Sequence, residues 1–198
     1  MKPIPTQDLY LRFERADLAP RLAQAMYDGQ RRALRPYGLE GMATKPPLEP
    51  GVLLVVARTG DSQLCAGLRL QRRTADRALP LEDAVELPAA SCRKLDELEP
   101  RGLAELGALW VDPSIRSEAV ADIVVHFAIT VARTHHMPNL VSLGALHSIP
   151  LALRTGFRLD PAEPAFPYPD SRYQSRLVWR PAEPIVAHLA PGATFTSR

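Results

Sequence analysis

The sequence predicts an α/β fold, and two observations lead to that class. The sequence contains short runs in which apolar residues alternate with others, which is typical of strands. Longer segments, in which apolar residues recur every three or four positions as in a helix, separate these runs. The connections are rich in proline and glycine, which mark turns. At 198 residues the chain suits one domain, which we expect to have a core over about 8–180, an insert at 74–100 and a tail at 181–198.

The expected elements follow from local patterns. The run over 52–59 is almost continuously apolar and β-branched, which predicts a buried strand. Asp17 and Ser148 are expected to cap helices at their N-termini, and Gly156 is expected to end one. In chain order we expect a strand at 8–14, a helix at 18–34, a loop at 36–50, a hairpin of strands at 52–59 and 63–73, an insert at 74–100 with a short helix at 91–98, a strand at 102–111, a helix at 118–133, a strand at 140–145, a short helix after 148, and strands at 157–159 and 174–180.

Composition excludes several functional classes. Lys and Arg total 24 and Asp and Glu total 22, so a formal charge of +2 gives no general attraction to nucleic acid. The two cysteines, Cys65 and Cys92, form neither a disulfide framework nor a cysteine-rich metal site. No apolar run approaches the roughly 18 residues of a membrane span, and no signal peptide is visible at the N-terminus. We therefore expect a cytoplasmic protein without a membrane span.

The segment from Gly102 to Ala121 carries the strongest functional signal. A strand is followed there by a turn and a long apolar helix, and the free backbone N–H groups at a helix start favour phosphate. Glu105 lies in the strand, within reach of a ligand above the turn. The chain has no Gly-x-x-x-x-Gly-Lys-Ser/Thr and no Gly-x-Gly-x-x-Gly after a strand, which disfavours kinases and nicotinamide enzymes.

The turn resembles the Arg/Gln-x-x-Gly-x-Gly/Ala loop of the GNAT acyltransferase superfamily. In that superfamily the backbone amides of the loop bind coenzyme A or the phosphopantetheine of acyl carrier protein. The strand end Leu109-Trp110-Val111-Asp112-Pro113 and the segment Ala152–Phe157, which ends in Gly-Phe, also resemble family motifs, and the element order matches over about 8–180. The resemblance implies a GNAT acyl-CoA N-acyltransferase fold, with a mixed central sheet and flanking helices. The residues implied to bind the cofactor are Leu109, Trp110, Val111, Arg116, Ser117, Glu118, Ala119, Val120 and Ala121.

A narrower resemblance is to autoinducer synthases and N-acyl-amino-acid synthases. Residues 67–70 and 79–82 are similar to the third strand and the insert of that branch, and Ala104-Glu105-Leu106 is similar to the start of its Glu-Leu-Ser-Arg strand. Gly107-Ala108 replaces the Ser-Arg pair here. Arginine N-succinyltransferases have a similar strand, so the branch stays open.

The resemblance implies direct transfer of an acyl group from a thioester to an amine. Glu105 is the candidate base that removes the amine proton, and we expect it to share a strand face with Leu103, Gly107, Leu109 and Val111. Partial burial would raise the pKa of Glu105 toward useful values. A backbone N–H between residues 109 and 111 is expected to polarise the thioester carbonyl.

The family's usual acid is a tyrosine in the late helix, and Ala152 stands at that position. His147 is the nearest alternative, and Tyr168 and Tyr173 are further options. Because Ala119 and Ala121 replace the usual loop glycines, a degenerate GNAT domain that binds acyl-CoA or a partner protein without catalysis is the alternative function.

The expected partners follow from these interpretations. We expect acyl-CoA or acyl carrier protein as the acyl donor, and a small-molecule amine as the acceptor. The histidines lack the spacing of a metal site, so no metal is expected. Nucleic acid is not expected as a partner, and a homodimer stays open.

Overall fold

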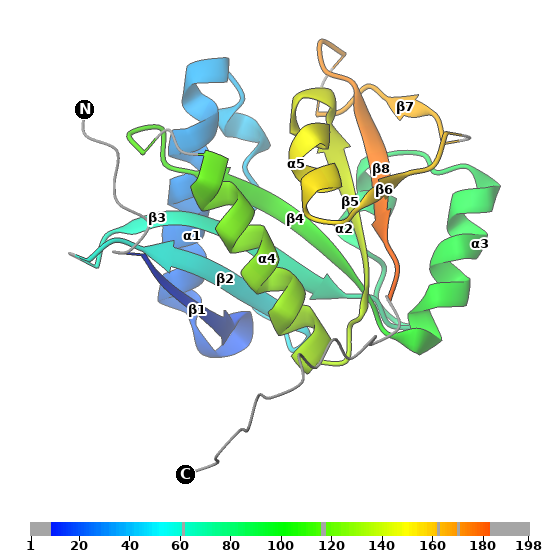
Figure 1. The fold of residues 1–198 in the computed structure, drawn as a ribbon, viewed down its shortest axis with the longest axis horizontal. Coiled ribbons are helices and arrows are strands. Elements are labelled where there is room, and N and C mark those ends of the chain that lie inside the picture. The colour runs from blue at the N-terminus through cyan, green and yellow to red at the C-terminus, as the bar shows by residue number, and fades with distance from the viewer. Residues whose placement is uncertain (1–8, 61, 116–117, 162, 170, 183–198) are drawn as a thin grey trace, which may run out of the picture.

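The computed structural model describes residues 9–60, 62–115, 118–161, 163–169 and 171–182. The predicted α/β class is confirmed (Figure 1). The strands are β1 (Tyr10–Arg15), β2 (Val52–Arg58), β3 (Leu64–Arg72), β4 (Leu103–Val111), β5 (Asn139–Ala145), β6 (Arg158–Leu159), β7 (Ala165–Phe166) and β8 (Ser175–Arg180). The α-helices are α1 (Pro20–Leu34), α2 (Pro80–Ala84), α3 (Ala89–Leu98), α4 (Glu118–Thr134) and α5 (Ile149–Arg154). Short 3-10 turns are η2 (Ala16–Leu18), η3 (Arg35–Tyr37), η4 (Glu40–Met42), η5 (Glu99–Arg101) and η6 (Leu146–Ser148).

The described strands form one mixed sheet, as expected. Their order is β1-β2-β3-β4-β5-β8-β6, and β7 pairs with β8. Neighbouring strands are antiparallel except β4 and β5, which run parallel. The parallel ladder joins Leu103–Glu105 to Asn139–Val141 and extends no further along the described strands. The later halves of β4 and β5 therefore flank an opening in the sheet.

A bulge in β4 lies beside this opening. Between the pairs Gly67–Trp110 and Arg69–Gly107, β3 contributes one residue and β4 contributes two, Ala108 and Leu109. Ala108 has a φ of 54°, a left-handed conformation that is uncommon for a residue other than glycine. Such an extra residue reverses which side chains face each side of the sheet.

The bulge corrects one expectation from the sequence. Leu109 and Val111 pack with the cluster under α4, whereas Leu103 belongs to the cluster under α2 and α3. The prediction that Leu109 and Val111 share a face with Glu105 is therefore wrong. Strict alternation along the strand gave that prediction, and the inserted residue interrupts the alternation.

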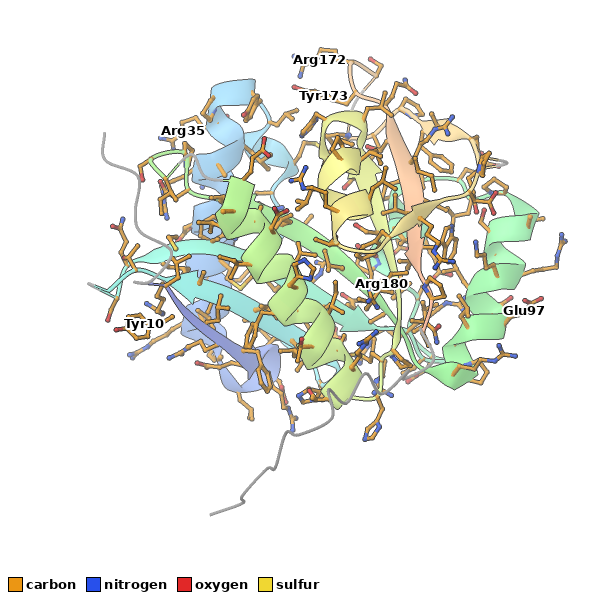
Figure 2. All side chains as sticks on the ribbon, in the orientation of Figure 1. Tyr10, Arg35, Glu97, Arg172, Tyr173 and Arg180 are labelled. Carbon is orange, nitrogen blue, oxygen red and sulfur yellow. The ribbon has the colours of Figure 1, made fainter. Side chains whose placement is uncertain are left out.

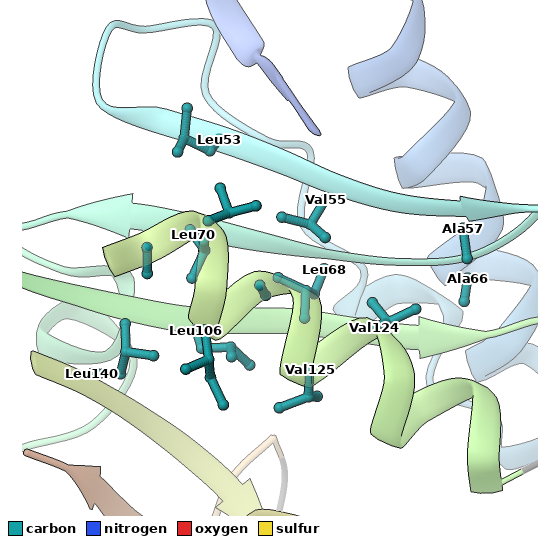
Figure 3. Packing of buried hydrophobic residues seen from close by; sticks show 14 of the residues in the cluster. Leu53, Val55, Ala57, Ala66, Leu68, Leu70, Leu106, Val124, Val125 and Leu140 are labelled. Carbon is teal, nitrogen blue, oxygen red and sulfur yellow. The ribbon is translucent and has the colours of Figure 1, made fainter. Parts of the chain in front are cut away.

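Helices cover both faces of the sheet. Along β2, Leu53, Val55 and Ala57 pack with α4, whereas the alternate residues 52, 54 and 56 pack with α1. Figure 3 shows the first of these layers, in which Val124 and Val125 of α4 lie over the strands. Burial on both faces explains why the strand sequence is apolar without alternation.

The insert at 74–100 forms α2 and α3, which cover the sheet on the side opposite α4. Arg73, just after β3, anchors both helices. Its guanidinium donates to both carboxylate oxygens of Glu82 at 2.9 and 3.0 Å, and its Nη1 lies 2.8 Å from Asp96 Oδ1. The expected short helix at 91–98 is thus confirmed as part of α3, whereas α2 was not expected from the sequence.

One predicted helix cap is wrong, and a second is confirmed in position only. Ala19 occupies the N-cap position of α1, and Asp17 lies two residues earlier, where it accepts hydrogen bonds from Arg15. Ser148 occupies the N-cap position of α5, as predicted, but its hydroxyl donates to the carbonyl of Ala145 and makes no capping bond to the helix. Among the described helices, none is long and apolar enough to cross a membrane.

Candidate active site

The opening between β4 and β5 leads into a space of about 290 Å³, which we call the apolar cavity. Side chains from both faces of the sheet contribute to it, because the strands no longer pair at this level. Its lining is mainly aliphatic and aromatic, and includes Leu34, Leu39, Leu106, Val125, Leu143 and Phe157. Tyr173 also lines it, and Figure 2 shows Tyr173 and Arg35 at the same end of the molecule.

A second space of about 310 Å³, which we call the polar pocket, lies beside α1 and α2. Its charged and hydroxyl-bearing lining residues are Arg69, Glu105, Tyr168, Asp83 and Thr44. The two spaces meet, because both are lined by Gln30, Met42, Gly107, Ala108, Leu143 and Tyr168. An apolar ligand part and a polar ligand part can therefore approach each other at the bulge of β4.

Glu105 is the acidic group at the base of the polar pocket, and it is 6% exposed. The backbone N–H of Leu81, in the first turn of α2, donates to its Oε2 at 2.8 Å. Burial raises the pKa of Glu105, while the nearby Arg69 charge and the Leu81 hydrogen bond act in the opposite direction. A buried carboxylate with a raised pKa and a single N–H donor is suited to accept a proton.

Gly107 leaves room for that carboxylate. A β-carbon at position 107 would lie 2.6 Å from Glu105 Oε1, closer than two such atoms approach each other. Gly107 is not in a left-handed conformation, so the reason for glycine here is space alone. Glycine at position 107 therefore leaves the Glu105 carboxylate the space that it occupies.

Arg69 extends from β3 beside Glu105 and is 4% exposed. Its Nη2 lies 3.6 Å from Glu105 Oε1, beyond ordinary hydrogen-bond distance. Burial lowers the pKa of Arg69, and the negative charge of Glu105 opposes that shift. A guanidinium keeps its charge even so.

Tyr168 completes the polar group from the loop before β8. Its backbone is fixed at both ends, because its N–H donates to Phe166 and its carbonyl accepts from the Ser175 hydroxyl at 2.8 Å. Burial raises the pKa of Tyr168, and the charge of Glu105 adds to that effect. The phenol therefore stays protonated near neutral pH and can donate a hydrogen bond where the two spaces meet.

The sequence matches no protein-family model, and no curated protein matches it. Solved structures match over most of the chain. An acyl-CoA N-acyltransferase from Pseudomonas aeruginosa superposes with a TM-score of 0.59 at 15% identity, covering 87% of this chain and 99% of that one. Tetrahymena GCN5 superposes with a TM-score of 0.58 at 12% identity, covering 89% and 98%.

A third match is FeeM, an N-acyl amino acid synthase from uncultured soil microbes, with a TM-score of 0.55 at 16% identity over 88% of this chain and 91% of that one. This chain has the GNAT fold. The expected fold is thereby confirmed. At such identities the likeness concerns the fold alone.

In this GNAT fold the strand end beside the opening contributes mainly backbone. Leu109 lines the apolar cavity, whereas the Trp110 indole packs against Gly29 of α1 and Gly67 of β3. Among the described residues, the pairing of β4 with β5 ends at Glu105, so the later part of β4 is unpaired on that edge. Backbone groups of residues 109–111 thus remain the candidates for contacts to a thioester carbonyl.

The predicted phosphate loop is described only in part. Arg116 and Ser117 lie outside the described residues. Glu118 begins α4, and its carboxylate lies 3.5 Å from Arg154 on α5. Ala119 is exposed, Ala121 is half-buried, and Val120 is buried in the core under α4. The Val120 side chain therefore belongs to the core, which leaves backbone amides as the cofactor contacts expected at this helix start.

The remaining candidates lie on the apolar cavity. His147 is exposed and lines it, and Ala152 also lines it. Glu105 and His147 face different spaces, so the structure does not bring these two predicted catalytic residues together in one pocket. Within the described part of the chain, no group of three or more His, Cys, Asp or Glu side chains is arranged to hold a metal ion.

Arg69 is the site residue that sequence reasoning missed. It occurs in a strand predicted from the alternation of Leu64, Ala66, Leu68 and Leu70, where a charged residue on the other face looks solvent-exposed. The signal that could have identified it is its place between Leu68 and Leu70, inside an otherwise buried strand. A charged side chain in such a strand is seldom left without a function or a partner.

Proposed function

We propose that this protein is an N-acyltransferase that moves an acyl group from acyl-CoA to a primary amine, with Glu105 as the base. The observation that carries the proposal is the meeting of two different spaces at the bulge of β4. The apolar cavity suits an acyl thioester, and the polar pocket holds the buried carboxylate of Glu105. Both reactants can therefore be bound together, as direct transfer requires.

The proposed chemistry is one acyl transfer. The amine nitrogen attacks the thioester carbonyl, the C–N bond forms, the C–S bond breaks, and coenzyme A leaves as the thiolate. Glu105 takes the proton that the amine nitrogen loses. A backbone N–H in residues 109–111 stabilises the negative charge on the carbonyl oxygen. The products are an amide and, after proton uptake, free coenzyme A.

We assign His147 to the donor side of this reaction. It lines the apolar cavity and is accessible to solvent, so it can pass a proton to the departing thiolate. Tyr173 lines the same cavity and is the alternative donor. The coenzyme A phosphates are proposed to bind the backbone amides at residues 116–121, ahead of and within the first turn of α4.

The test follows thiol release from acetyl-, succinyl-, octanoyl- and palmitoyl-CoA with pooled primary amines. We expect release above background with at least one donor, accompanied by the matching amide in the mass spectrum. Glu105→Gln should lower kcat by roughly 10²- to 10⁴-fold while leaving CoA binding intact. Acyl carrier protein loaded with the same acyl groups, tested in parallel, distinguishes the two kinds of donor.

One set of observations favours a second function, that of an acyl-CoA-binding module without catalysis. Ala119 and Ala121 replace the glycines that allow a phosphate to approach closely, and Glu118 and Asp112 add negative charge near the same turn. Measurable CoA binding, without thiol release for any combination of donor and amine, would support the binding module and contradict the proposed enzymatic activity.

A further inference from the structure

The first turn of α2 is held by one acidic side chain, Glu82. Its Oε2 accepts a hydrogen bond from the backbone N–H of Leu79 at 2.7 Å, and its two oxygens accept from the guanidinium of Arg73 at 2.9 and 3.0 Å. The side chains of Arg73 and Glu82 are 15% and 17% exposed, so salt and water screen this pair weakly. We call these two residues the α2 clamp.

The same turn carries the hydrogen-bond donor of the proposed base. The backbone N–H of Leu81, the residue before Glu82, donates to Glu105 Oε2 at 2.8 Å. It is one of the N–H groups at a helix start that have no partner within the helix. The position of this turn therefore decides whether Glu105 has its donor.

Arg73 ties this turn to the strand that carries Glu105. The backbone N–H of Arg73 donates to the carbonyl of Leu103 at 3.0 Å, and Leu103 precedes Glu105 by two residues in β4. Helix α2 has only five residues, too few to hold its own geometry, so its position depends on contacts with the rest of the fold. A two-point contact between a guanidinium and a carboxylate is well suited to fix such a short helix.

Several groups act on the ionisation of Glu105. The charged and titratable side chains among them are Arg69 from β3, Glu82 and Asp83 from α2, and Tyr168 from the loop before β8. Burial raises the pKa of Glu105, Arg69 and the Leu81 N–H lower it, and the charges of Glu82 and Asp83 raise it. Glu82 therefore has two opposite effects, one through its charge and one through the turn that it holds.

We propose that Arg73 and Glu82 are positioning residues for the base, because their ion pair holds the first turn of α2 so that the Leu81 N–H stays on Glu105. The inference rests on the proposed function, since it concerns the base of that reaction. Neither Arg73 nor Glu82 lines the apolar cavity or the polar pocket, so they act through Leu81 and do not touch a reactant.

The experiment separates position from charge. Glu82→Asp keeps the charge but is one methylene shorter, so it cannot reach both Arg73 and Leu79. Arg73→Lys also keeps the charge and loses the two-point contact. Asp83→Asn is the matched reference, because it removes a charge from the same helix and leaves the clamp intact. The pKa of Glu105 is measured by NMR titration of protein labelled with ¹³C at the glutamate carboxyl carbons, and its signal is the one missing in Glu105→Gln.

We expect the titration of Glu105 to move to higher pH by roughly 1 unit in both clamp variants, the value of a hydrogen bond to a charged group. In Asp83→Asn it should move to lower pH, because one negative charge is gone. The pH dependence of kcat should move with the NMR titration, and the KM for acyl-CoA should stay unchanged. The double variant should shift no further than either single variant, since both break the same contact.

Circular dichroism and thermal unfolding show which clamp variants are folded, and either one alone decides the inference. If Glu105 titrates in the folded clamp variants as in wild type, the clamp does not place the Leu81 N–H, and the inference is overturned. If the titration moves as expected but kcat does not follow it, or no donor and amine release thiol, the proposed function is overturned. The placement of the Leu81 N–H by the clamp then stands.

Discussion

Gly107 and Glu105 lie next to each other on the same face of β4, and a β-carbon on Gly107 would lie 2.6 Å from Oε1 of Glu105. The carboxylate therefore occupies space that other amino acids at position 107 would fill. Since Oε1 is at the end of a flexible side chain, the structure would respond by moving the carboxylate and not the strand.

Gly107→Ala is expected to lower kcat at least 10-fold with little loss of stability, because it displaces the proposed base from its hydrogen bond with Leu81. Thiol-release kinetics and thermal unfolding measure the two effects. Gly41→Ala is the matched control, since an added β-carbon at position 41 meets no atom within 4 Å. If kcat in Gly107→Ala is unchanged, Glu105 is not the base of the reaction.

The pH dependence follows from the burial of Glu105. The base must be ionised, so kcat/KM should rise with pH and level off above the pKa of Glu105, which burial raises above the ordinary value of about 4.3. A profile from pH 4 to 9 for wild type and Glu105→Gln measures this limb. If the same rise of kcat/KM with pH persists in Glu105→Gln, the group that loses the proton is the acceptor amine and not Glu105.

The same shift has a consequence for stability. A carboxyl group whose pKa is higher in the folded than in the unfolded chain binds more protons when folded, so its contribution favours folding at low pH. That contribution is lost as pH rises from the unfolded to the folded pKa. In this window the free energy of unfolding of wild type should fall with pH more steeply than that of Glu105→Gln, as measured by urea denaturation.

The apolar cavity should determine the acyl chain length. Ala152→Phe places a large ring in the cavity from α5, and we expect it to reduce kcat/KM for octanoyl-CoA at least 10-fold more than for acetyl-CoA. Leu153→Phe is the matched control, because Leu153 is the next residue of α5 and is 49% exposed. An equal effect of Ala152→Phe on both donors would place the acyl chain elsewhere.

Gly29 of α1 permits the close packing of Trp110. A β-carbon at position 29 would lie 2.4 Å from two atoms of the indole, which is buried and cannot move aside freely. Gly29→Ala should therefore destabilise the fold by about 1–3 kcal/mol, the usual cost of overpacking. Chemical denaturation measures it against Gly41→Ala, and a stability equal to that control would contradict this account of the α1 contact.

Local patterns predicted most elements well, because apolar periodicity records which faces are buried. The strand at 52–59 and the helix at 118–133 were predicted to within a residue of β2 and α4. The N-terminal caps were predicted only in part: Ser148 occupies the N-cap of α5, but its hydroxyl bonds to Ala145, and Asp17 bonds to Arg15. Hydrogen bonds of this kind depend on neighbours that the local sequence does not reveal.

The sequence by itself determined the element order, the likeness to the GNAT superfamily and the choice of Glu105, because these depend on periodicity and on motifs that are continuous along the chain. Only the tertiary structure revealed the bulge at Ala108, the meeting of the two spaces, and Arg69 next to Glu105. Arg69 and Glu105 are 36 residues apart in sequence and are brought together by the pairing of β3 with β4. Burial and the distance between two charges are properties of that pairing, so they exist only once the sheet has formed.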